Sequence, residues 1–142
     1  MRILFLVIFI SSLALEINAQ TNIALPVIKS SIHGINIYGK PIDHQTRCQH
    51  WHSELDVIAI KFKCCEKYYP CFSCHEESSG HKPQVWAKSE FDSKAILCGV
   101  CGTELSITDY QNSNNTCPKC SAAFNPGCSK HYHLYFETDL KN

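Results

Sequence analysis

Two Cys-x-x-Cys pairs in the second half of the chain constrain its fold more than any other feature. Cys98 and Cys101 form the first pair, Cys117 and Cys120 form the second, and fifteen residues separate them. Two thiolates three residues apart on a tight turn can reach the same metal ion, and two such turns complete a tetrahedron around zinc. The sequence therefore predicts one zinc ion held by four thiolates.

A second group upstream mixes cysteines with histidines. It consists of five Cys and three of the four His between residues 48 and 81, enough for two further tetrahedral sites. Their order along the chain suggests that the two sites interleave. One division places Cys48, His50, Cys71 and Cys74 in one site and Cys64, Cys65, His75 and His81 in the other. The spacing supports the set of eight ligands more firmly than this division. In an extended strand, Cys64 and Cys65 would point to opposite sides, so either the chain turns there or the two cysteines serve different metals.

The remaining cysteine and histidines lack this spacing. His33, His44 and His52 are interpreted as surface or packed residues. Cys128 is the odd thiol once nine cysteines bind metal. Two interpretations stay open for the C-terminal residues: a fourth, partial site, or ordinary packing and surface positions. They are Cys128, His131 and His133.

A disulfide framework is the main alternative to zinc. The ten cysteines are an even number, and a secreted chain would meet an oxidising compartment. Adjacent Cys64 and Cys65, together with histidines at ligand spacing, suit metal sites better than long-range bridges. A dithiol redox site at Cys98 and Cys101 is weaker still, since no βαβ pattern surrounds it.

The first nineteen residues differ in kind from the rest. Arg2 precedes a largely apolar run from Ile3 to Leu15, and a small-residue cleavage point follows at Ala19. This pattern is typical of a signal peptide and is short for a membrane-spanning helix. We expect residues 1–19 to be a signal-like segment that directs secretion, or attaches the chain to a membrane if it is not cleaved. Residues 20–34 are predicted to be a linker.

The folded domain is expected to span residues 35–137, followed by a tail at 138–142. Strands are predicted at 35–38, 55–63 and 95–97, a short capped helix at 106–110, and a strand-like piece at 131–136. These elements are short and the apolar runs are broken, so the domain needs help to be stable. We predict a small α+β fold stabilised by zinc, with short strands and loops around about three tetrahedral sites.

Charge and motifs exclude several functions. Thirteen basic residues balance thirteen acidic ones, and nine ionised thiols with three Zn²⁺ ions would bring the net charge near −3. A nucleic acid is therefore a poor partner, because its phosphates need a basic face. We find no nucleophile elbow, phosphate loop or dinucleotide fingerprint, and so expect no enzymatic activity.

The order of the ligands resembles the CHY-type zinc finger family, and in particular its small stand-alone members. The flanking strings that carry the resemblance are 56–65 (DVIAIKFKCC), 68–71 (YYPC), 96–101 (ILCGVC) and 124–128 (FNPGC). The resemblance covers residues 35–137, and all twelve ligand positions of the family pattern are filled. It implies three zinc ions held by those twelve residues.

The same resemblance implies a function and a compartment. Fungal mitochondrial members of the family handle zinc in the intermembrane space, support assembly of small Tim chaperones for protein insertion into the inner membrane, and remove zinc from a thiol oxidase. We therefore expect a chaperone-like zinc-binding protein with a thiol-rich or zinc-bearing protein partner. Two alternatives stay open: a protein-interaction module with purely structural zincs, and a secreted disulfide-stapled protein. Larger family members continue into a RING domain and act as ubiquitin ligases, an activity not expected here.

Overall fold

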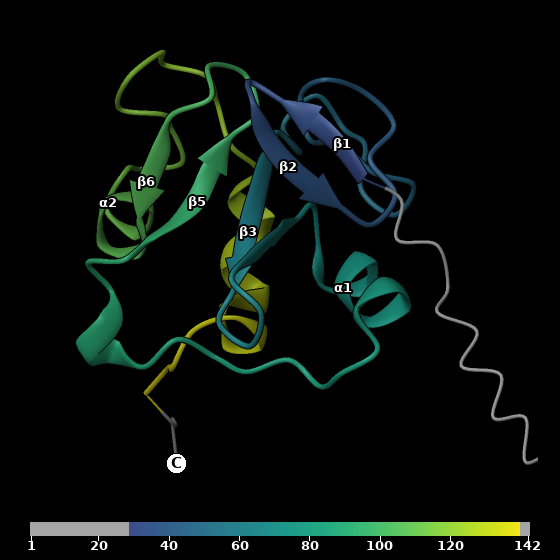
Figure 1. Ribbon diagram of the computed structural model, residues 1–142. Coiled ribbons are helices and arrows are strands. Elements are labelled where there is room, and N and C mark those ends of the chain that lie inside the picture. Colours follow the sequence, from purple (N-terminus) through teal and green to yellow (C-terminus); the bar gives the residue numbers. More distant parts are fainter. Residues whose placement is uncertain (1–28, 140–142) are drawn as a thin grey trace, which may run out of the picture.

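A six-stranded sheet forms the centre of the protein (Figure 1). The computed structural model describes residues 29–139. The strand order is β1-β2-β4-β3-β5-β6, and every neighbouring pair is antiparallel except β2 and β4. The strands are β1 (Lys29–Ile32), β2 (Ile35–Tyr38), β3 (Ile58–Phe62), β4 (Lys67–Tyr69), β5 (Lys94–Cys98) and β6 (Glu104–Ser106). With its short helices, the chain has the small α+β fold that the sequence predicts.

The central strand β3 separates two apolar clusters. Ile58, Ile60 and Phe62 face the larger cluster, while Ala59 packs into a smaller one on the opposite side with Leu97. Side chains alternate along a strand, so the period of two in the sequence carries these residues to one face. Both faces of β3 are therefore buried, and this strand anchors the loops that carry the metal ligands.

Two α-helices and two 3₁₀ helices complete the described chain. They are α1 (Phe72–Ser79), η1 (Lys88–Glu90), α2 (Ile107–Gln111) and η2 (Pro126–Leu134). The capped helix expected near residue 106 is present as α2, where the Ser106 side chain accepts a hydrogen bond from the Asp109 N–H and the Asp109 carboxylate accepts one from the Ser106 N–H. This reciprocal pair is a capping box, which satisfies backbone donors that a helix leaves free.

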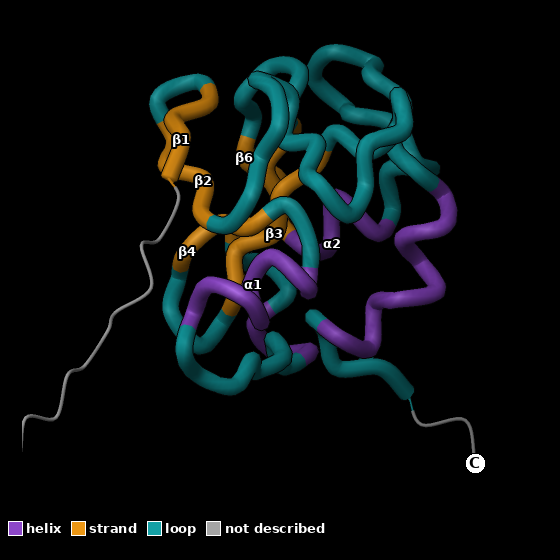
Figure 2. The backbone as a smooth tube through the Cα atoms, turned by 90° about the vertical axis from the view of Figure 1, so that its right-hand side faces the viewer, coloured by secondary structure: helices purple, strands orange, loops and turns teal. Residues whose placement is uncertain are grey.

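The C-terminal segment is helical where the sequence predicts a strand-like piece. Residues 131–134 continue η2 rather than forming a strand, and the strand-like pairing is a single bridge between Trp86 and Phe136. Asn125 starts the helix, because its side chain accepts a hydrogen bond from the Gly127 N–H and Pro126 cannot join a sheet ladder. The helix lies across one face of β3 (Figures 1 and 2).

The N-terminal edge of the domain lies earlier than expected. Strand β1, at 29–32, falls inside the stretch predicted to be a linker, and it forms a hairpin with β2 through a turn at His33 and Gly34. Ile32 is buried against the smaller apolar cluster, which gives this short strand a reason to stay paired. The signal-like segment at 1–19 and residues 20–28 lie outside the described residues. Within 29–139, no helix has both the length and the apolar character needed to cross a membrane.

Candidate metal centres

The structure brings the twelve predicted ligands together in three groups of four. Within each group, one ligand atom per residue lies within 4.8 Å of every other. Site 1 is formed by Cys48, His50, Cys71 and Cys74; site 2 by Cys64, Cys65, His75 and His81; site 3 by Cys98, Cys101, Cys117 and Cys120. This is the division that the interleaved order of the sequence suggests.

The distances within the groups fit zinc. A zinc ion with Zn–S bonds of about 2.3 Å sits in a tetrahedron of sulfurs whose edges are about 3.8 Å. The Sγ–Sγ distance is 3.8 Å between Cys98 and Cys120 and 3.8 Å between Cys101 and Cys117. In site 1, the Cys48 and Cys71 sulfurs are 3.7 Å apart. All ten cysteines are free of disulfide bonds, so the structure fits metal ligation rather than a disulfide framework.

Site 1 is enclosed by the protein. Its three cysteines, Cys48, Cys71 and Cys74, are buried, and the Nδ1 atom of His50 lies 3.5 Å from two of their sulfurs. Gly39 lies against this site with a backbone φ of +92°, and a Cβ there would come within 2.7 Å of the Cys74 Cβ. Only glycine allows the chain to pass so close to the ligand.

A carboxylate orients the histidine of site 1. The Nε2 atom of His50 lies 2.9 Å from Oε1 of Glu77, and the other carboxylate oxygen pairs with Lys40 at 2.7 Å. The ion pair with Lys40 and the hydrogen bond with His50 lower the pKa of Glu77. The carboxylate therefore stays ionised and fixes the proton of His50 on Nε2, which leaves Nδ1 free to face the thiolates.

Site 2 depends on a tight turn that the sequence could not specify. After β3 the chain reverses, and the Cys65 and Glu66 N–H groups both donate to the Phe62 carbonyl, with Glu66 at a φ of +53°. The turn ends the alternation of an extended strand, so Cys64 and Cys65 both reach the same site. The uncertainty about where these adjacent cysteines point is resolved by this reversal.

Aromatic packing holds the buried histidine of site 2. The ring of His75 stacks on Phe62 with centroids 4.0 Å apart and an interplanar angle of 7°. The Tyr69 ring packs against the His75 ring in a T-shaped arrangement, with the two ring centroids 5.0 Å apart. Burial, and secondarily the nearby His81, lowers the pKa of His75 to about 4. The ring is therefore neutral near pH 7, which is the form that binds zinc.

One serine contacts both histidines of site 2. The Ser79 hydroxyl lies 3.4 Å from Nδ1 of His75, and the Ser79 carbonyl accepts a hydrogen bond from Nδ1 of His81 at 2.9 Å. The Nε2 atoms of the two rings are thereby left for the metal, and Nε2 of His75 lies 3.3 Å from the Cys64 sulfur. Such contacts set the tautomer and direction of a ligand ring.

Helix α1 links the first two sites. Cys74 and His75 are adjacent in its first turns but serve site 1 and site 2 respectively. Glu77 and Ser79 follow in its last turn and support the histidines of the same two sites. The supporting roles of Glu77 and Ser79 could not be identified from the sequence. Neither their residue type nor their spacing distinguishes them from ordinary solvent-exposed residues of a helix.

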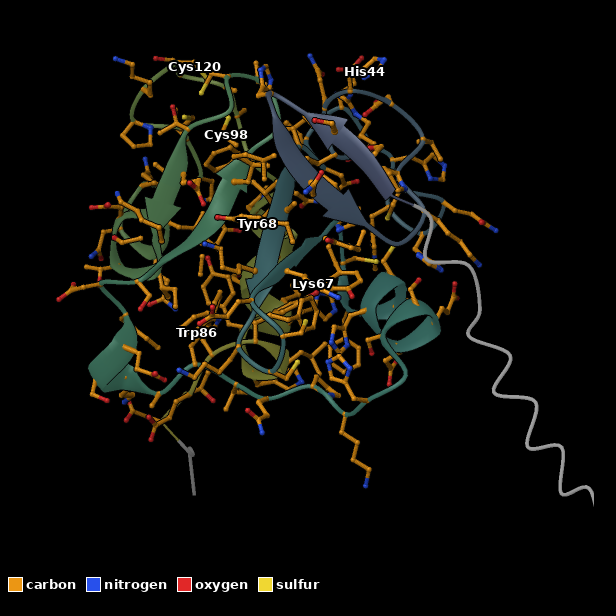
Figure 3. All side chains as sticks on the ribbon, in the orientation of Figure 1. His44, Lys67, Tyr68, Trp86, Cys98 and Cys120 are labelled. Atoms are coloured by element: carbon orange, nitrogen blue, oxygen red, sulfur yellow. The ribbon has the colours of Figure 1, made fainter. Side chains whose placement is uncertain are left out.

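Site 3 lies at the end of β5, where Figure 3 shows Cys98 and Cys120 close together. The turn after Cys98 is crossed by the β1–β2 hairpin, since the Nε2 atom of His33 donates a hydrogen bond to the Gly99 carbonyl at 3.0 Å. Gly102 has a φ of +75°, and a Cβ there would come within 2.6 Å of the His33 Cβ. His33 belongs to none of the three ligand groups, but it contacts the metal-binding turn directly.

The three sites differ in how far their ligands reach the surface. In site 2, Cys64 and Cys65 are partly exposed and His81 is exposed. In site 3, Cys98 and Cys117 are buried while Cys120 is exposed. Site 1 reaches solvent through the partly exposed His50 alone. Site 2 is therefore the most accessible of the three, with three of its four ligands at the surface.

The C-terminal residues left open by the sequence do not form another cluster. Among residues 29–139, the three groups above are the metal-like groups, and they include neither Cys128 nor His131 nor His133. His131 packs against Trp51 with the two rings tilted by 49° and their centroids 6.0 Å apart. Cys128 is partly buried beside Tyr110, and burial raises the pKa of its thiol. Ordinary packing for Cys128 and His131 and a surface position for His133 account for these residues.

Comparison with known proteins agrees with this geometry. Residues 48–132 match the family model described as the CHY zinc finger. The chain is 53% identical over 104 residues to Helper of Tim protein 13 of Saccharomyces cerevisiae, covering 71% of this chain and 90% of that protein. It is 46% identical over 103 residues to the protein of the same name from Kluyveromyces lactis, covering 72% and 90%.

A third relative comes from fission yeast. An uncharacterized protein of Schizosaccharomyces pombe is 40% identical over 112 residues, covering 79% of this chain and 96% of that protein. The aligned lengths show that these relatives correspond to the zinc-bearing domain almost from end to end.

Proposed function

Because this chain belongs to the CHY zinc finger family, we propose that it is a non-enzymatic zinc-handling protein that assists the assembly of a cysteine-rich partner protein. The name of its budding-yeast relatives describes a helper of Tim proteins. By that likeness, the proposed partners are Tim proteins and the proposed compartment is the mitochondrial intermembrane space. Any membrane attachment would come through residues 1–19.

The observation that carries this proposal is the exposure of site 2. A protein that passes or receives zinc must let a foreign ligand approach the metal, and in site 2 the exposed His81 leaves that approach open. His81 follows α1 on a loop, and its contact with Ser79 comes from the residue two positions earlier. The ring is exposed and packs against one buried ring, that of His75, with centroids 5.0 Å apart, so its displacement would cost that contact.

Charge favours the same site for exchange. Two thiolates balance the charge of Zn²⁺ in site 2, whereas four thiolates leave −2 in site 3 and three leave −1 in site 1. An incoming thiolate of a partner meets the least repulsion at a neutral centre. We therefore assign the exchange role to site 2 and anchoring roles to sites 1 and 3, whose thiols are largely buried.

The test compares two exposed histidines. The full chain with three zinc ions is titrated with a chromophoric chelator, as wild type, as His81→Ala, and as His133→Ala, a control outside the three groups. We expect one zinc ion to leave the wild type well before the other two, and His81→Ala to hold two. His133→Ala should match the wild type.

A transfer measurement completes the test. The same samples are mixed with a metal-free protein bearing paired cysteines, and the zinc in each protein is measured after separation. We expect wild type to pass zinc, in amounts up to one ion per chain, and His81→Ala to pass none. If all three ions leave the wild type together and no zinc passes to the metal-free protein, the protein is an interaction module with purely structural zincs.

A further inference from the structure

The loop that joins β2 to β3 contacts the first turn of site 3 at two points. The Gln45 carbonyl and the Thr46 hydroxyl lie so close to Gly99 that a Cβ on Gly99 would be 2.4 and 2.7 Å from them. Further along the loop, the Val57 carbonyl accepts a hydrogen bond from the Gly99 N–H at 2.7 Å. Because Gly99 directly follows the ligand Cys98, this loop holds the turn on which site 3 is built.

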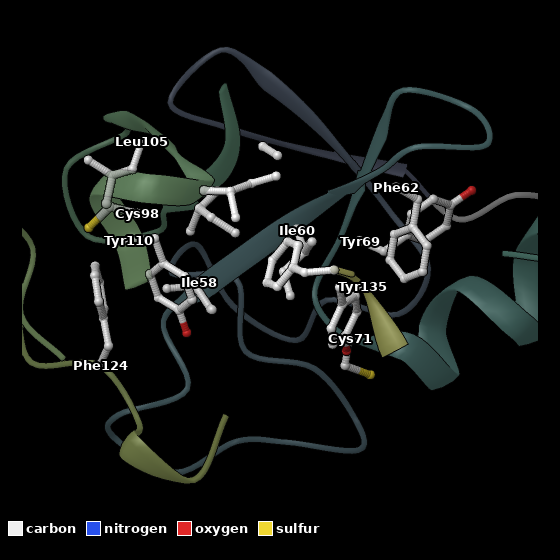
Figure 4. Close-up of a cluster of buried hydrophobic side chains, with 14 of the residues drawn as sticks. Ile58, Ile60, Phe62, Tyr69, Cys71, Cys98, Leu105, Tyr110, Phe124 and Tyr135 are labelled. Atoms are coloured by element: carbon white, nitrogen blue, oxygen red, sulfur yellow. The ribbon is translucent and has the colours of Figure 1, made fainter. Parts of the chain in front are cut away.

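The sheet holds the other side of this turn. Cys98 ends β5 and pairs with Ile58, the first residue of β3, and both side chains belong to the larger apolar cluster (Figure 4). Gly99 is the first residue beyond the strand. The sulfur ligand is therefore placed by core packing, whereas the turn after it is placed by the β2–β3 loop and by the hydrogen bond from His33.

The same loop carries two ligands of site 1, Cys48 and His50. A single residue, Arg47, separates Cys48 from Thr46. The Arg47 N–H donates to Oδ1 of Asp43 at 3.2 Å, and the Arg47 guanidinium donates to Oδ2 of the same carboxylate at 2.9 Å. A displacement of Thr46 therefore reaches Cys48 through one residue whose backbone and side chain are both tied down.

The backbone of Thr46 is strained. Its φ is +69°, in the left-handed region that β-branched residues rarely adopt, and the residue is 1% exposed. Its hydroxyl donates a hydrogen bond to the Gln45 carbonyl at 2.5 Å, and both of these groups lie against Gly99. A strained conformation persists only where its surroundings enforce it. Here the surroundings are the site 1 loop on one side and the site 3 turn on the other.

We propose that Thr46 is a positioning residue that couples sites 1 and 3, so that metal bound in either site strengthens binding at the other. Metal in site 1 fixes Cys48 and keeps Thr46 against Gly99, while metal in site 3 fixes the turn that Thr46 meets. When either site is empty, the loop can move off Gly99 and the Thr46 backbone relaxes. Filling the other site must then restore the strained arrangement, which weakens its binding.

Site 2 lies outside this arrangement. Its ligands Cys64, Cys65, His75 and His81 follow β3 or lie on and after α1, and none belongs to the β2–β3 loop. Emptying site 2 should therefore leave the metal affinity of site 3 unchanged, which makes site 2 the control. The inference goes beyond the proposed zinc handling, and it stands whether or not site 2 exchanges zinc.

The experiment measures metal binding site by site in the full chain. Protein loaded with the NMR-active cadmium isotope should give three separate signals, because sites 1, 2 and 3 hold three, two and four thiolates. A chelator titration then follows the loss of each signal. Three variants each remove one ligand that is exposed or partly exposed: His50→Ala weakens site 1, His81→Ala weakens site 2 and Cys120→Ser weakens site 3.

The expected pattern is reciprocal. With site 1 empty in His50→Ala, the cadmium affinity of site 3 should fall about tenfold, within the usual range of coupling between two sites. With site 3 empty in Cys120→Ser, the affinity of site 1 should fall by the same factor, because linkage between two binding equilibria acts equally in both directions. With site 2 empty in His81→Ala, the affinity of site 3 should match that of the wild type.

Substitutions of Thr46 place the coupling on this residue. In Thr46→Gly, emptying site 1 should no longer affect site 3, because glycine adopts a positive φ without strain and has no hydroxyl. Thr46→Ser keeps a Cβ and the hydroxyl, and should retain the coupling of about tenfold. Gly99→Ala pushes the loop away from the turn and should weaken sites 1 and 3 together, with site 2 unchanged. Circular dichroism and metal content show that each variant is folded.

Three results would overturn the proposal. Equal affinity of site 3 with site 1 filled or empty would show that the two sites are independent. An equal loss of site 3 affinity in His81→Ala would mean that any empty site loosens the whole domain. Coupling that survives Thr46→Gly would show that it passes through other residues. None of these results concerns zinc transfer from site 2, so failure here and failure of the proposed function are distinguished.

Discussion

The Nε2 atom of His50 lies 2.9 Å from Oε1 of Glu77, and this contact joins a metal ligand on a loop to the last turn of α1. The same carboxylate pairs with Lys40, which follows β2. Three segments distant in sequence are thus held around site 1 by one side chain. The geometry of a zinc site depends on such supporting contacts as much as on the ligands themselves.

Removal of this carboxylate should weaken site 1. Glu77→Ala is expected to lower the zinc affinity of one site by about 10–100-fold, the usual effect of losing a partner of a ligand histidine. Glu77→Gln should fall between Ala and wild type, since the amide oxygen still accepts a hydrogen bond without the charge. Competition with a chelator measures the affinity. The neighbouring Glu76→Ala is the control, and an equal effect there would remove the special role of Glu77.

The metal content should be three zinc ions per chain. Each of the three groups offers four ligand atoms within 4.8 Å of one another. Elemental analysis and native mass spectrometry of protein purified without added metal check this number. One zinc ion or fewer, together with disulfide bonds, would contradict the assignment.

Two cysteine substitutions should have opposite outcomes. Cys117→Ser removes a buried ligand of site 3, and the protein should hold two zinc ions and lose order around the end of β5. A structural zinc contributes an apparent ~10–16 kcal/mol to folding, comparable with the whole stability of a small domain. Cys128→Ser should keep three zinc ions. Mass spectrometry and thermal unfolding measure both, and the reverse pattern would mean that the odd thiol has been misassigned.

Two glycines with similar backbone angles allow the cost of a left-handed backbone to be measured separately from the cost of a steric clash. Gly80 and Gly102 have φ values of +71° and +75°, but a Cβ at Gly80 meets no atom within 4 Å. Gly80→Ala should cost about 1–2 kcal/mol from the left-handed backbone alone. Gly102→Ala should cost more, because the new Cβ displaces His33 from the turn of site 3. Chemical denaturation compares them, and equal costs would show that His33 adjusts freely.

The reactivity of Cys128 should depend on pH in a defined direction. Burial favours the neutral thiol and raises the pKa of Cys128 above its ordinary value of 9.0. The thiolate is the nucleophile, so alkylation of the folded, zinc-loaded protein should reach half of its limiting rate above pH 9.0. The raised pKa also means that stability contributed by this group is present below pH 9 and is lost as pH rises further. A midpoint at or below 9.0 would show that the thiol is not shielded.

The ligand set and the central strand could be predicted from the sequence. Metal ligation is encoded by residue type and short spacing, as in Cys98 and Cys101, because a tight turn alone brings two thiols to one ion. The alternation of Ile58, Ile60 and Phe62 likewise specifies one buried face, since the period of a strand is local. For the same reason the family likeness could be read from these short strings.

Contacts between distant segments were decided only by the tertiary structure. The sequence placed residues 29–32 in a linker and 131–136 in a strand, whereas packing of Ile32 pairs β1 with β2 and the Asn125 cap starts η2. The hydrogen bonds from His50 to Glu77 and from His33 to Gly99 join residues 27 and 66 positions apart. No local pattern encodes such pairs, because their geometry exists only after α1 has packed beside the loop that follows β2 and the β1–β2 hairpin has packed beside the end of β5.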